Sequence, residues 1–309
     1  MKPNYLSKFF LLILFLIVCM GWCLGQNNPS KIDQEDLRAI IEMLSSEQFE
    51  GRDVGNYGQI KTQEYIVERF KALQIEPYSA DGYLEKFSLE IGRPLRKVET
   101  ANVIGIIKGE SEQSIILSAH YDHVGKNETS YYPGADDNAS GIAALLELAE
   151  EFAEYEKLKY TMIFLATTAE EVGLVGSSIH VENPDFDPAK VVCSFHFDMI
   201  SRCDSKQTDC NYIYCIGNDQ FALLDSLVRK ADELFPHCTF NYSENDSGIL
   251  TRTDASNFVQ KGIPSVLFFS GFHDDYHKPT DTVDKIDFEI LENRVKLICE
   301  VVKLLVWGI

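Results

Sequence analysis

Five short stretches of the chain place histidine or carboxylate side chains directly after apolar segments. The residues concerned are His120, Asp137, Glu171, Asp198 and His277. Imidazole nitrogens and carboxylate oxygens are the ligands of catalytic zinc sites that keep a position open. Two imidazoles and three carboxylates suffice for two adjacent metal sites that share one aspartate. The set therefore predicts a two-metal centre, and either of the adjacent Asp136 and Asp137 could be the shared ligand.

Two further acidic residues lie beside predicted ligands. Glu170 precedes Glu171, so one carboxylate can bind metal while its neighbour remains free to move protons. Asp122 follows His120 by two residues, where its carboxylate could accept the second N–H of the imidazole and fix its tautomer. The aspartate pair precedes a strongly predicted helix, whose first N–H groups can hold a carboxylate in place.

Strands alternate with helices in the elements that must position these residues. Apolar residues at helical spacing predict helices over residues 35–44, 58–75, 142–152, 221–235 and 288–307. Apolar runs of strand length predict strands over residues 83–91, 102–108, 114–119, 161–166, 191–197 and 265–269. Several of these strands are apolar on both faces, which indicates an α/β fold with a mixed, largely parallel sheet and helices on both faces. The site of such a sheet lies beyond the carboxyl ends of its strands.

The first 25 residues have the pattern of a secretory signal peptide. Lys2 and Lys8 precede an apolar run over residues 9–20, and small residues surround the expected cleavage point after Gly25. We therefore expect residues 26–309 to form a single catalytic domain that is periplasmic or secreted. An uncleaved membrane anchor is the alternative, but the apolar run is short for a bilayer span. A cleaved signal would leave no stable membrane insertion.

The 309 residues include 28 basic and 48 acidic side chains, which give a formal net charge of −20. Phosphate backbones repel so acidic a chain, so we expect no nucleic-acid partner. The sequence leaves the oligomeric state open.

Six of the eight cysteines follow residue 25, and no CxxC pair suggests a cysteine-ligated structural zinc. Cys203 and Cys210 flank a short polar loop and form the predicted disulfide, which an oxidising compartment permits. Cys193 and Cys299 lie in apolar runs and are predicted to be buried free thiols.

Taken in order, these stretches resemble the co-catalytic di-zinc aminopeptidase family, which also includes glutamate carboxypeptidase, the transferrin-receptor ectodomain and glutaminyl cyclase. The resemblance covers nearly all of residues 26–309. The matching stretches are LSSEQFEGR (44–52), AHYD (119–122), GADDNASG (134–141), EEVGL (170–174), FDMI (197–200) and YHKPTDT (276–282). It implies a single zinc-exopeptidase-like domain with two Zn²⁺ per chain. His120 and Asp198 would hold one ion and Glu171 and His277 the other, with Asp137 as the bridge, followed by a cis peptide bond.

The resemblance also implies roles in catalysis. Glu170 would be the general base for a metal-activated water, Asp122 the partner of His120, and Tyr276 a hydrogen-bond donor to the oxyanion. We therefore expect an exported aminopeptidase that hydrolyses N-terminal residues from peptide substrates. A glutaminyl cyclase, which typically keeps one zinc, and a non-catalytic peptide-binding relative are the alternatives, but the complete ligand set with Glu170 favours hydrolysis. Carboxypeptidase or dipeptidase action stays open.

One position departs from the family pattern. Many relatives have a histidine where this chain has Ala255, so the sequence leaves the shape of the substrate pocket open. Arg252 nearby could contact substrate, although a surface position is the simpler interpretation. Four other histidines have no partner in the pattern and are expected to be structural: His123, His196, His237 and His273.

Overall fold

The computed structural model of the protein describes residues 30–245 and 248–307. The predicted signal peptide, residues 1–25, lies outside the described residues. Ile32–Ile309 packs as one unit, and the elements below all belong to it.

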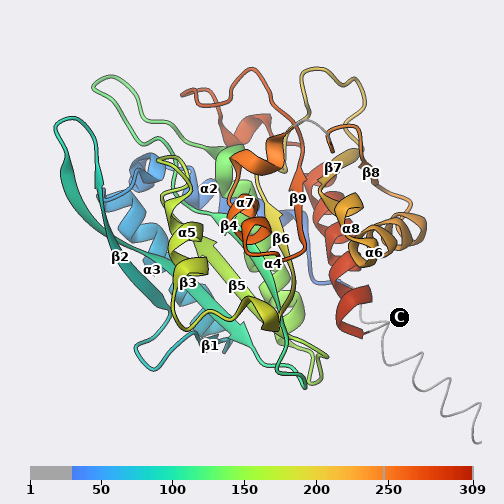
Figure 1. Cartoon of the computed structure of the whole chain (residues 1–309). Coiled ribbons are helices and arrows are strands. Elements are labelled where there is room, and N and C mark those ends of the chain that lie inside the picture. The colour runs from blue at the N-terminus through green and yellow to red at the C-terminus, as the bar shows by residue number, and fades with distance from the viewer. Residues whose placement is uncertain (1–29, 246–247, 308–309) are drawn as a thin grey trace, which may run out of the picture. The chain divides into compact units, whose positions relative to one another are not determined.

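A mixed sheet of nine strands, counted over the described residues, forms the centre of this unit (Figure 1). The strands are β1 (Glu76–Pro77), β2 (Leu84–Ile91), β3 (Arg96–Ile107), β4 (Ser114–His120), β5 (Thr161–Thr167), β6 (Val191–Phe197), β7 (Tyr212–Ile216), β8 (Thr239–Asn241) and β9 (Ser265–Phe269). Their order is β1-β3-β5-β4-β6-β9-β7-β8, and β2 pairs with β3 beside this path. The four central strands β5, β4, β6 and β9 are parallel, whereas β3 and β7 join them antiparallel.

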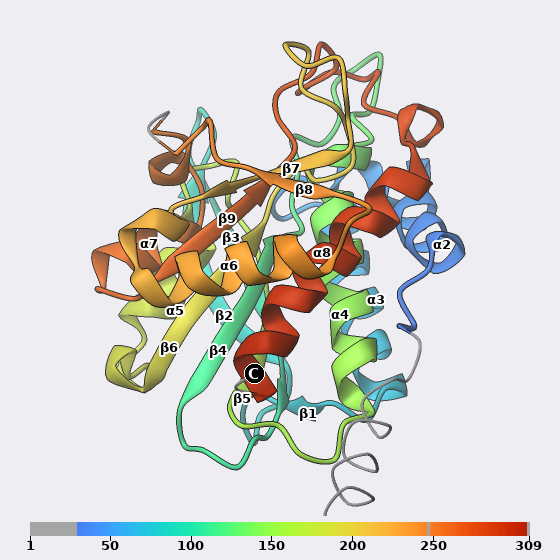
Figure 2. The ribbon, with the colours of Figure 1, turned by 90° about the vertical axis from the view of Figure 1, so that its right-hand side faces the viewer.

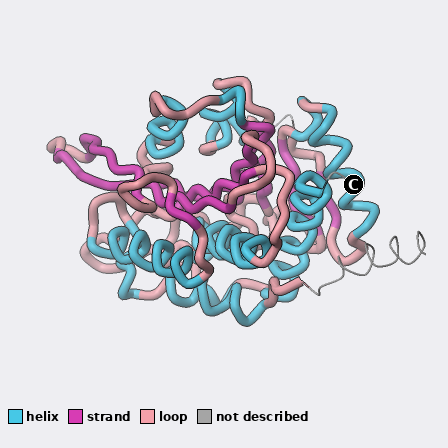
Figure 3. The backbone as a smooth tube through the Cα atoms, turned by 90° about the horizontal axis from the view of Figure 1, so that it is seen from below, coloured by secondary structure: helices cyan, strands magenta, loops and turns pink. Residues whose placement is uncertain are grey.

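Helices cover both faces of the sheet (Figures 2 and 3). They are α2 (Gln34–Leu44), α3 (Tyr57–Ala72), α4 (Gly141–Ala153), α5 (Val175–Glu182), α6 (Ala222–Leu234), α7 (Ala255–Gln260) and α8 (Phe288–Trp307). Helix α4 packs on β4, β5 and β6, and α2, α3 and α8 contact α4 in turn. Helices α5 and α7 contact each other on the opposite face, where α7 also meets β6 and β9.

The structure confirms the predicted α/β class and most of the predicted elements. Strands β6 and β9 and helix α8 have the predicted bounds, because each is a continuous or periodic apolar run with clear breaks. Strand β3 begins at Arg96, earlier than predicted, because its first residues pair with β2 beyond the central sheet. The sequence missed β7, β8, α5 and α7, which have between three and eight residues and lie between polar loops.

Helix α4 is more deeply buried than its amphipathic pattern suggests. Its acidic face lies under α2, α3 and α8, so Glu147 and Glu151 have side chains only 2% and 3% exposed. Lys303 pairs with Glu151 at 2.9 Å. Arg69 is 3.7 Å from Glu147 but 3.0 Å from Glu150. Burial, with the nearby carboxylates of Asp36 and Glu150, therefore raises the pKa of Glu147 to about 8.

We expect the substitution Glu147→Gln to change how stability depends on pH. The pKa of Glu147 is higher in the folded protein than its ordinary 4.5, so the wild type loses stability as pH rises from about 4.5 to about 8. The glutamine variant lacks this loss, so its advantage in unfolding free energy should grow by about 2 kcal/mol between pH 5 and pH 7. Urea unfolding across this range measures the difference. Glu42 is exposed and pairs only with Arg38 among the described residues, so Glu42→Gln is the control. If the unfolding free energies of Glu147→Gln and the wild type differed by the same amount at every pH, the effect of burial would be contradicted.

The cysteines lie as predicted. Cys203 and Cys210 form a disulfide with their Cα atoms 5.3 Å apart. Cys193 and Cys299 are buried free thiols, as are Cys215 and Cys238. Among residues 30–245 and 248–307, no helix combines the length and apolarity needed to cross a bilayer.

Candidate metal centre and cleft

The predicted ligands meet at the carboxyl ends of the parallel strands. His120 ends β4, Asp198 follows β6, and Glu171 comes shortly after β5. Asp137 comes instead from the segment Ala135–Ser140, which leads into α4, and His277 from the long loop after β9. All five line one open cleft of about 430 Å³, together with Glu170 and Tyr276. The structure thus brings together seven of the eight predicted site residues, and Asp122 lies buried beside them.

One cluster consists of His120, Asp137 and Asp198. Nε2 of His120 lies 3.5 Å from Oδ1 of Asp137 and 3.4 Å from Oδ1 of Asp198. Neighbouring ligand atoms around a tetrahedral zinc with bonds of 2.0–2.1 Å are roughly 3.3 Å apart. The three side chains therefore fit a zinc ion and leave a fourth position for another ligand.

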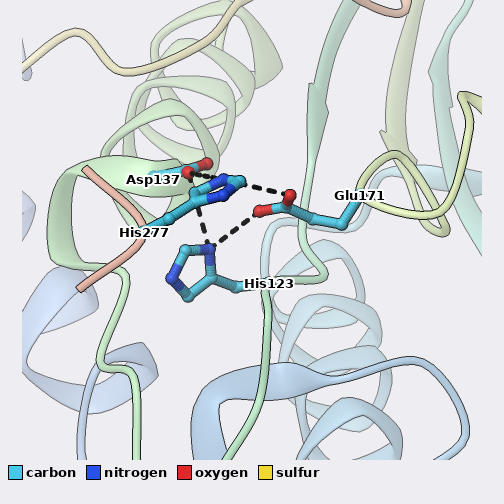
Figure 4. Close-up of side chains that lie close together, drawn as sticks. All are labelled: His123, Asp137, Glu171 and His277. Atoms are coloured by element: carbon cyan, nitrogen blue, oxygen red, sulfur yellow. Dashed lines mark hydrogen bonds and ion pairs between the residues drawn. The ribbon is translucent and has the colours of Figure 1, made fainter. Parts of the chain in front are cut away.

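A second cluster combines Asp137 with Glu171 and His277 (Figure 4). Nε2 of His277 is 3.1 Å from Oδ2 of Asp137 and 3.1 Å from Oε2 of Glu171. Burial lowers the pKa of His277, but the facing carboxylates of Asp137 and Glu171 outweigh it and raise the pKa to about 10. The two oxygens of Asp137 thus face different clusters, which is the arrangement that a bridging ligand needs.

Asp136 is held away from both clusters. Its Oδ1 accepts hydrogen bonds from the backbone N–H and the hydroxyl of Ser201, both at 2.7 Å, and its Oδ2 lies 3.1 Å from Nε2 of His273. These contacts occupy its carboxylate, so the geometry favours Asp137 as the shared ligand. The peptide bond between Asp137 and Asn138 is cis, as the family resemblance implies.

Arg52 fixes the backbone around the metal centre, a role that the sequence did not reveal. The side chain is fully buried and donates to five main-chain carbonyls. These belong to Leu44, Tyr121, Pro133, Gly134 and Asp137. Burial lowers the pKa of Arg52 to about 10, against the opposing effect of nearby carboxylates. From the other side, the carboxylate of Asp281 accepts the N–H groups of Asp136 and Asp137 at 3.1–3.2 Å.

We expect Arg52→Lys to destabilise the protein strongly. A lysine ammonium has three donors in a compact head, so it leaves several of the five buried carbonyls without a partner. The unfolding free energy should fall by about 3 kcal/mol or more in urea titrations at fixed zinc concentration. Arg229 is 58% exposed, and Arg229→Lys should change stability by less than about 0.5 kcal/mol. Equal stabilities for the two variants would contradict the positioning role of Arg52.

Asp122 supports the glutamates more directly than it supports His120. Its two carboxylate oxygens accept the backbone N–H groups of Glu170 and Glu171 at 3.2 and 3.3 Å. Nδ1 of His120 lies 3.8 Å from this carboxylate and instead hydrogen-bonds the main-chain oxygen of Asp122 at 3.1 Å. Burial raises the pKa of Asp122 to about 7, although His120 acts in the opposite direction. The same residue thus orients one ligand through its backbone and the glutamate pair through its side chain.

Glu170 lines the cleft but belongs to neither cluster of predicted ligands. Burial raises its pKa to about 10, and the carboxylates of Asp198 and Asp254 add to this, while His120 opposes it. Cations held at the two clusters would favour the ionised carboxylate that a general base requires. The residue before it, Ala169, has a positive φ of 59°, as Met199 (50°) and His277 (54°) also have. Such backbone conformations are rare outside glycine and gather at functional sites.

The other walls of the cleft are largely aromatic and aliphatic. The ring of Tyr276 stacks on His277 with centroids 3.9 Å apart, and burial and nearby carboxylates keep its pKa above the ordinary value, so the hydroxyl stays a donor. Four apolar side chains complete this wall: Met199, Ile249, Phe269 and Phe272. Arg252 is exposed and also lines the cleft, whereas Ala255 is fully buried at the start of α7.

The histidines without a predicted partner divide into two kinds. His196 lies within 2.5 Å of the Ser118 hydroxyl and His273 contacts Asp136, so both have structural partners. His123 differs, because its Nδ1 is 2.9 Å from Oε1 of Glu171 (Figure 4). The sequence named no partner for His123, and the structure places the carboxylate of Glu171 beside it. The spacing of His120 and His123, three residues apart around Asp122, was the signal available for it.

The chain is similar to several known proteins in sequence or in fold. The probable lipoprotein aminopeptidase LpqL of Mycobacterium tuberculosis is 26% identical over 305 residues, an alignment that covers 88% of this chain and 58% of that protein's length. Two solved structures share the fold. The zinc aminopeptidase BSAP of Bacillus subtilis has a TM-score of 0.74 at 17% identity, covering 90% of this chain and 97% of that one. The glutaminyl cyclase of Porphyromonas gingivalis has a TM-score of 0.71 at 17% identity, covering 89% and 99%.

The family can be assigned from the sequence profile. The profile of peptidase family M28 matches residues 102–302, which contain every predicted ligand and Glu170. The resemblance stated from the sequence motifs is thereby confirmed, since both zinc aminopeptidases and a glutaminyl cyclase share the fold. The chain belongs to peptidase family M28.

Proposed function

We propose that the protein is a two-zinc aminopeptidase that hydrolyses N-terminal residues from peptides. The observation that carries this proposal is the cleft in which four predicted ligand side chains surround the fifth, Asp137, and leave Glu170 outside both clusters. His120 and Asp198 would hold one zinc, Glu171 and His277 the other, and Asp137 both. Zinc bound there would polarise the scissile carbonyl and acidify water.

The residues of the chain then divide the proton transfers between them. Glu170 takes a proton from the attacking water and returns it to the leaving amine, which a single mobile carboxylate can do in sequence. The hydroxyl of Tyr276 donates to the oxygen on which negative charge develops. Asp122 holds the backbone of Glu170 and Glu171, so the base and the ligand keep their relative positions.

The composition of the cleft supports action at a free amino terminus. Two bound Zn²⁺ would offset the four carboxylates of Asp137, Glu170, Glu171 and Asp198, and an open metal position could accept the lone pair of a free amine, which an N-acetyl group lacks. The facing wall includes Met199, Ile249 and Phe272, which suit an apolar N-terminal side chain. We therefore expect leucine or phenylalanine to be preferred over charged residues at that position.

Export is part of the same proposal. Residues 1–25 would be the signal peptide and residues 26–309 the catalytic domain, acting in the periplasm or outside the cell. The disulfide between Cys203 and Cys210 suits an oxidising compartment, and the relative LpqL is named a lipoprotein. Peptides are the proposed partners, and the acidic chain argues against nucleic acid.

Glutaminyl cyclisation is the competing function, because a glutaminyl cyclase shares the fold. A peptide with an N-terminal glutamine followed by several residues separates the possibilities when its products are identified by mass spectrometry. An aminopeptidase releases free glutamine, a cyclase removes only ammonia, and a carboxypeptidase shortens the other end. Release of the N-terminal residue by the zinc-loaded protein is expected. Ammonia loss with an intact chain would assign the cyclase, and shortening from the carboxyl end would assign the carboxypeptidase.

A further inference from the structure

His123 is a buried imidazole whose polar contacts all lie on the metal-centre side. Its side chain is 0% exposed, and Nδ1 lies 2.9 Å from Oε1 of Glu171 and 3.6 Å from Oδ2 of Asp137. Its other nitrogen, Nε2, has no hydrogen-bond partner within the described residues. Burying a polar group without a partner costs free energy, so the position of this ring requires an interaction at Nδ1 that outweighs the cost.

The ring of His123 lies beside that of His277 at the second cluster (Figure 4). The two imidazoles are nearly perpendicular, at 73°, with centroids 5.7 Å apart (Figure 4). The carboxylate of Glu171 contacts both rings, with Oε1 facing His123 and Oε2 facing His277. One ligand atom from each of His123, Asp137, Glu171 and His277 lies within 4.8 Å of the others. Two imidazoles and two carboxylates around one point form a complete four-coordinate zinc set.

We propose that His123 is a fourth protein ligand of the metal held by Asp137, Glu171 and His277. This inference rests on the proposed two-zinc function and adds a ligand to it. The two sites then differ, because the cluster of His120, Asp137 and Asp198 supplies three protein ligands and the other cluster four. The four-ligand site should bind its ion more tightly, and the open position for water or substrate belongs to the metal at His120 and Asp198.

A simpler reading of the 2.9 Å contact is a hydrogen bond from Nδ1–H of His123 to Glu171, which would only orient that ligand. The two arrangements differ in the number of imidazoles bound to zinc. A hydrogen-bonding His123 leaves one imidazole per zinc, those of His120 and His277. A ligating His123 gives three imidazoles for two zinc ions and two on the more tightly held ion.

Zinc K-edge X-ray absorption of the wild-type protein counts these imidazoles directly. Samples with one and with two equivalents of zinc should both show more than one imidazole per zinc, and the count should be higher at one equivalent. One imidazole per zinc in both samples would overturn the inference while leaving the two-zinc function intact. A protein that binds no zinc at all would overturn both.

The variant His123→Ser gives a second, independent measurement. Removing a residue that only orients a ligand typically weakens metal binding by about 10–100-fold, so loss of a ligand should exceed about 100-fold at the tighter site. Competition of the metal-free protein with a chromophoric chelator measures this affinity. His237 is exposed and contacts only the Phe235 ring among the described residues, so His237→Ser should leave the affinity unchanged. A loss below about 100-fold in a folded His123→Ser protein would contradict the ligand role, and the absorption measurement needs no variant.

Discussion

Replacing Glu170 by glutamine should lower the turnover of an unblocked peptide by about 1,000-fold or more and leave the zinc content near two ions per chain. The amide has nearly the shape of the carboxylate but cannot accept and return a proton, and general acid–base catalysis contributes about 10²–10⁴-fold. Glu170 lines the cleft and the geometry assigns it to neither metal cluster, so its removal should spare the ligands.

The two readouts must be taken on the same preparation. Metal analysis after dialysis gives the zinc content, and the rate at saturating substrate gives kcat. Glu64 is exposed on α3, so Glu64→Gln provides a matched loss of one carboxylate and should leave both values unchanged. Near-normal turnover in Glu170→Gln would remove Glu170 as the base. A parallel loss of zinc would show instead that Glu170 supports the ligands.

The substitution Asp137→Asn should weaken the binding of both metals and abolish activity at a low free zinc concentration. Oδ1 of Asp137 faces His120 and Oδ2 faces His277, so a neutral amide with one oxygen cannot serve two cations. Zinc content should fall from about two ions per chain to below one, and added zinc should restore activity only at much higher concentration. Metal analysis after dialysis against a fixed free zinc concentration measures the change.

The neighbouring residue supplies the control. The carboxylate of Asp136 is occupied by Ser201 and His273, so Asp136→Asn should keep most of its zinc even if the fold is weakened. Comparing the two variants at equal folded fraction, judged by circular dichroism, separates ligation from stability. Loss of zinc in Asp136→Asn with retention in Asp137→Asn would reverse the assignment of the bridging ligand.

The candidate site was predictable from sequence where a predicted ligand ends or follows an apolar strand. His120 and Asp198 directly end or follow strands that are almost wholly buried, and a charged residue at such a position needs a partner. The order of the ligands along the chain then matched a known family. The residue types alone did not show whether Asp136 or Asp137 is the shared ligand, because the two are adjacent and identical. Only tertiary contacts show that the carboxylate of Asp136 is already occupied.

The supporting residues were harder to predict because their partners are distant in sequence. Arg52 donates to five main-chain carbonyls that lie between residues 44 and 137 of the chain. Every residue has such a carbonyl, so the sequence does not mark these acceptors. The carboxylate of Asp281 accepts the backbone N–H of Asp136, which lies 145 residues earlier in the chain. His123 lies in a loop three residues after the predicted ligand His120, and this spacing was the one signal for it in the sequence. Short elements such as α7 form through packing on β6 and β9 rather than through their own periodicity.

The most direct test of the proposed aminopeptidase is the rate ratio between a leucine-led peptide and its N-acetylated twin, measured with the zinc-loaded protein. Both peptides have the same peptide bonds, and only one carries the free amino group that the zinc-loaded cleft is expected to bind. We predict release of leucine from the free peptide and no detectable release from the acetylated one. Equal cleavage of the two peptides, or no cleavage of either by a protein that holds two zinc ions, would contradict the proposed function.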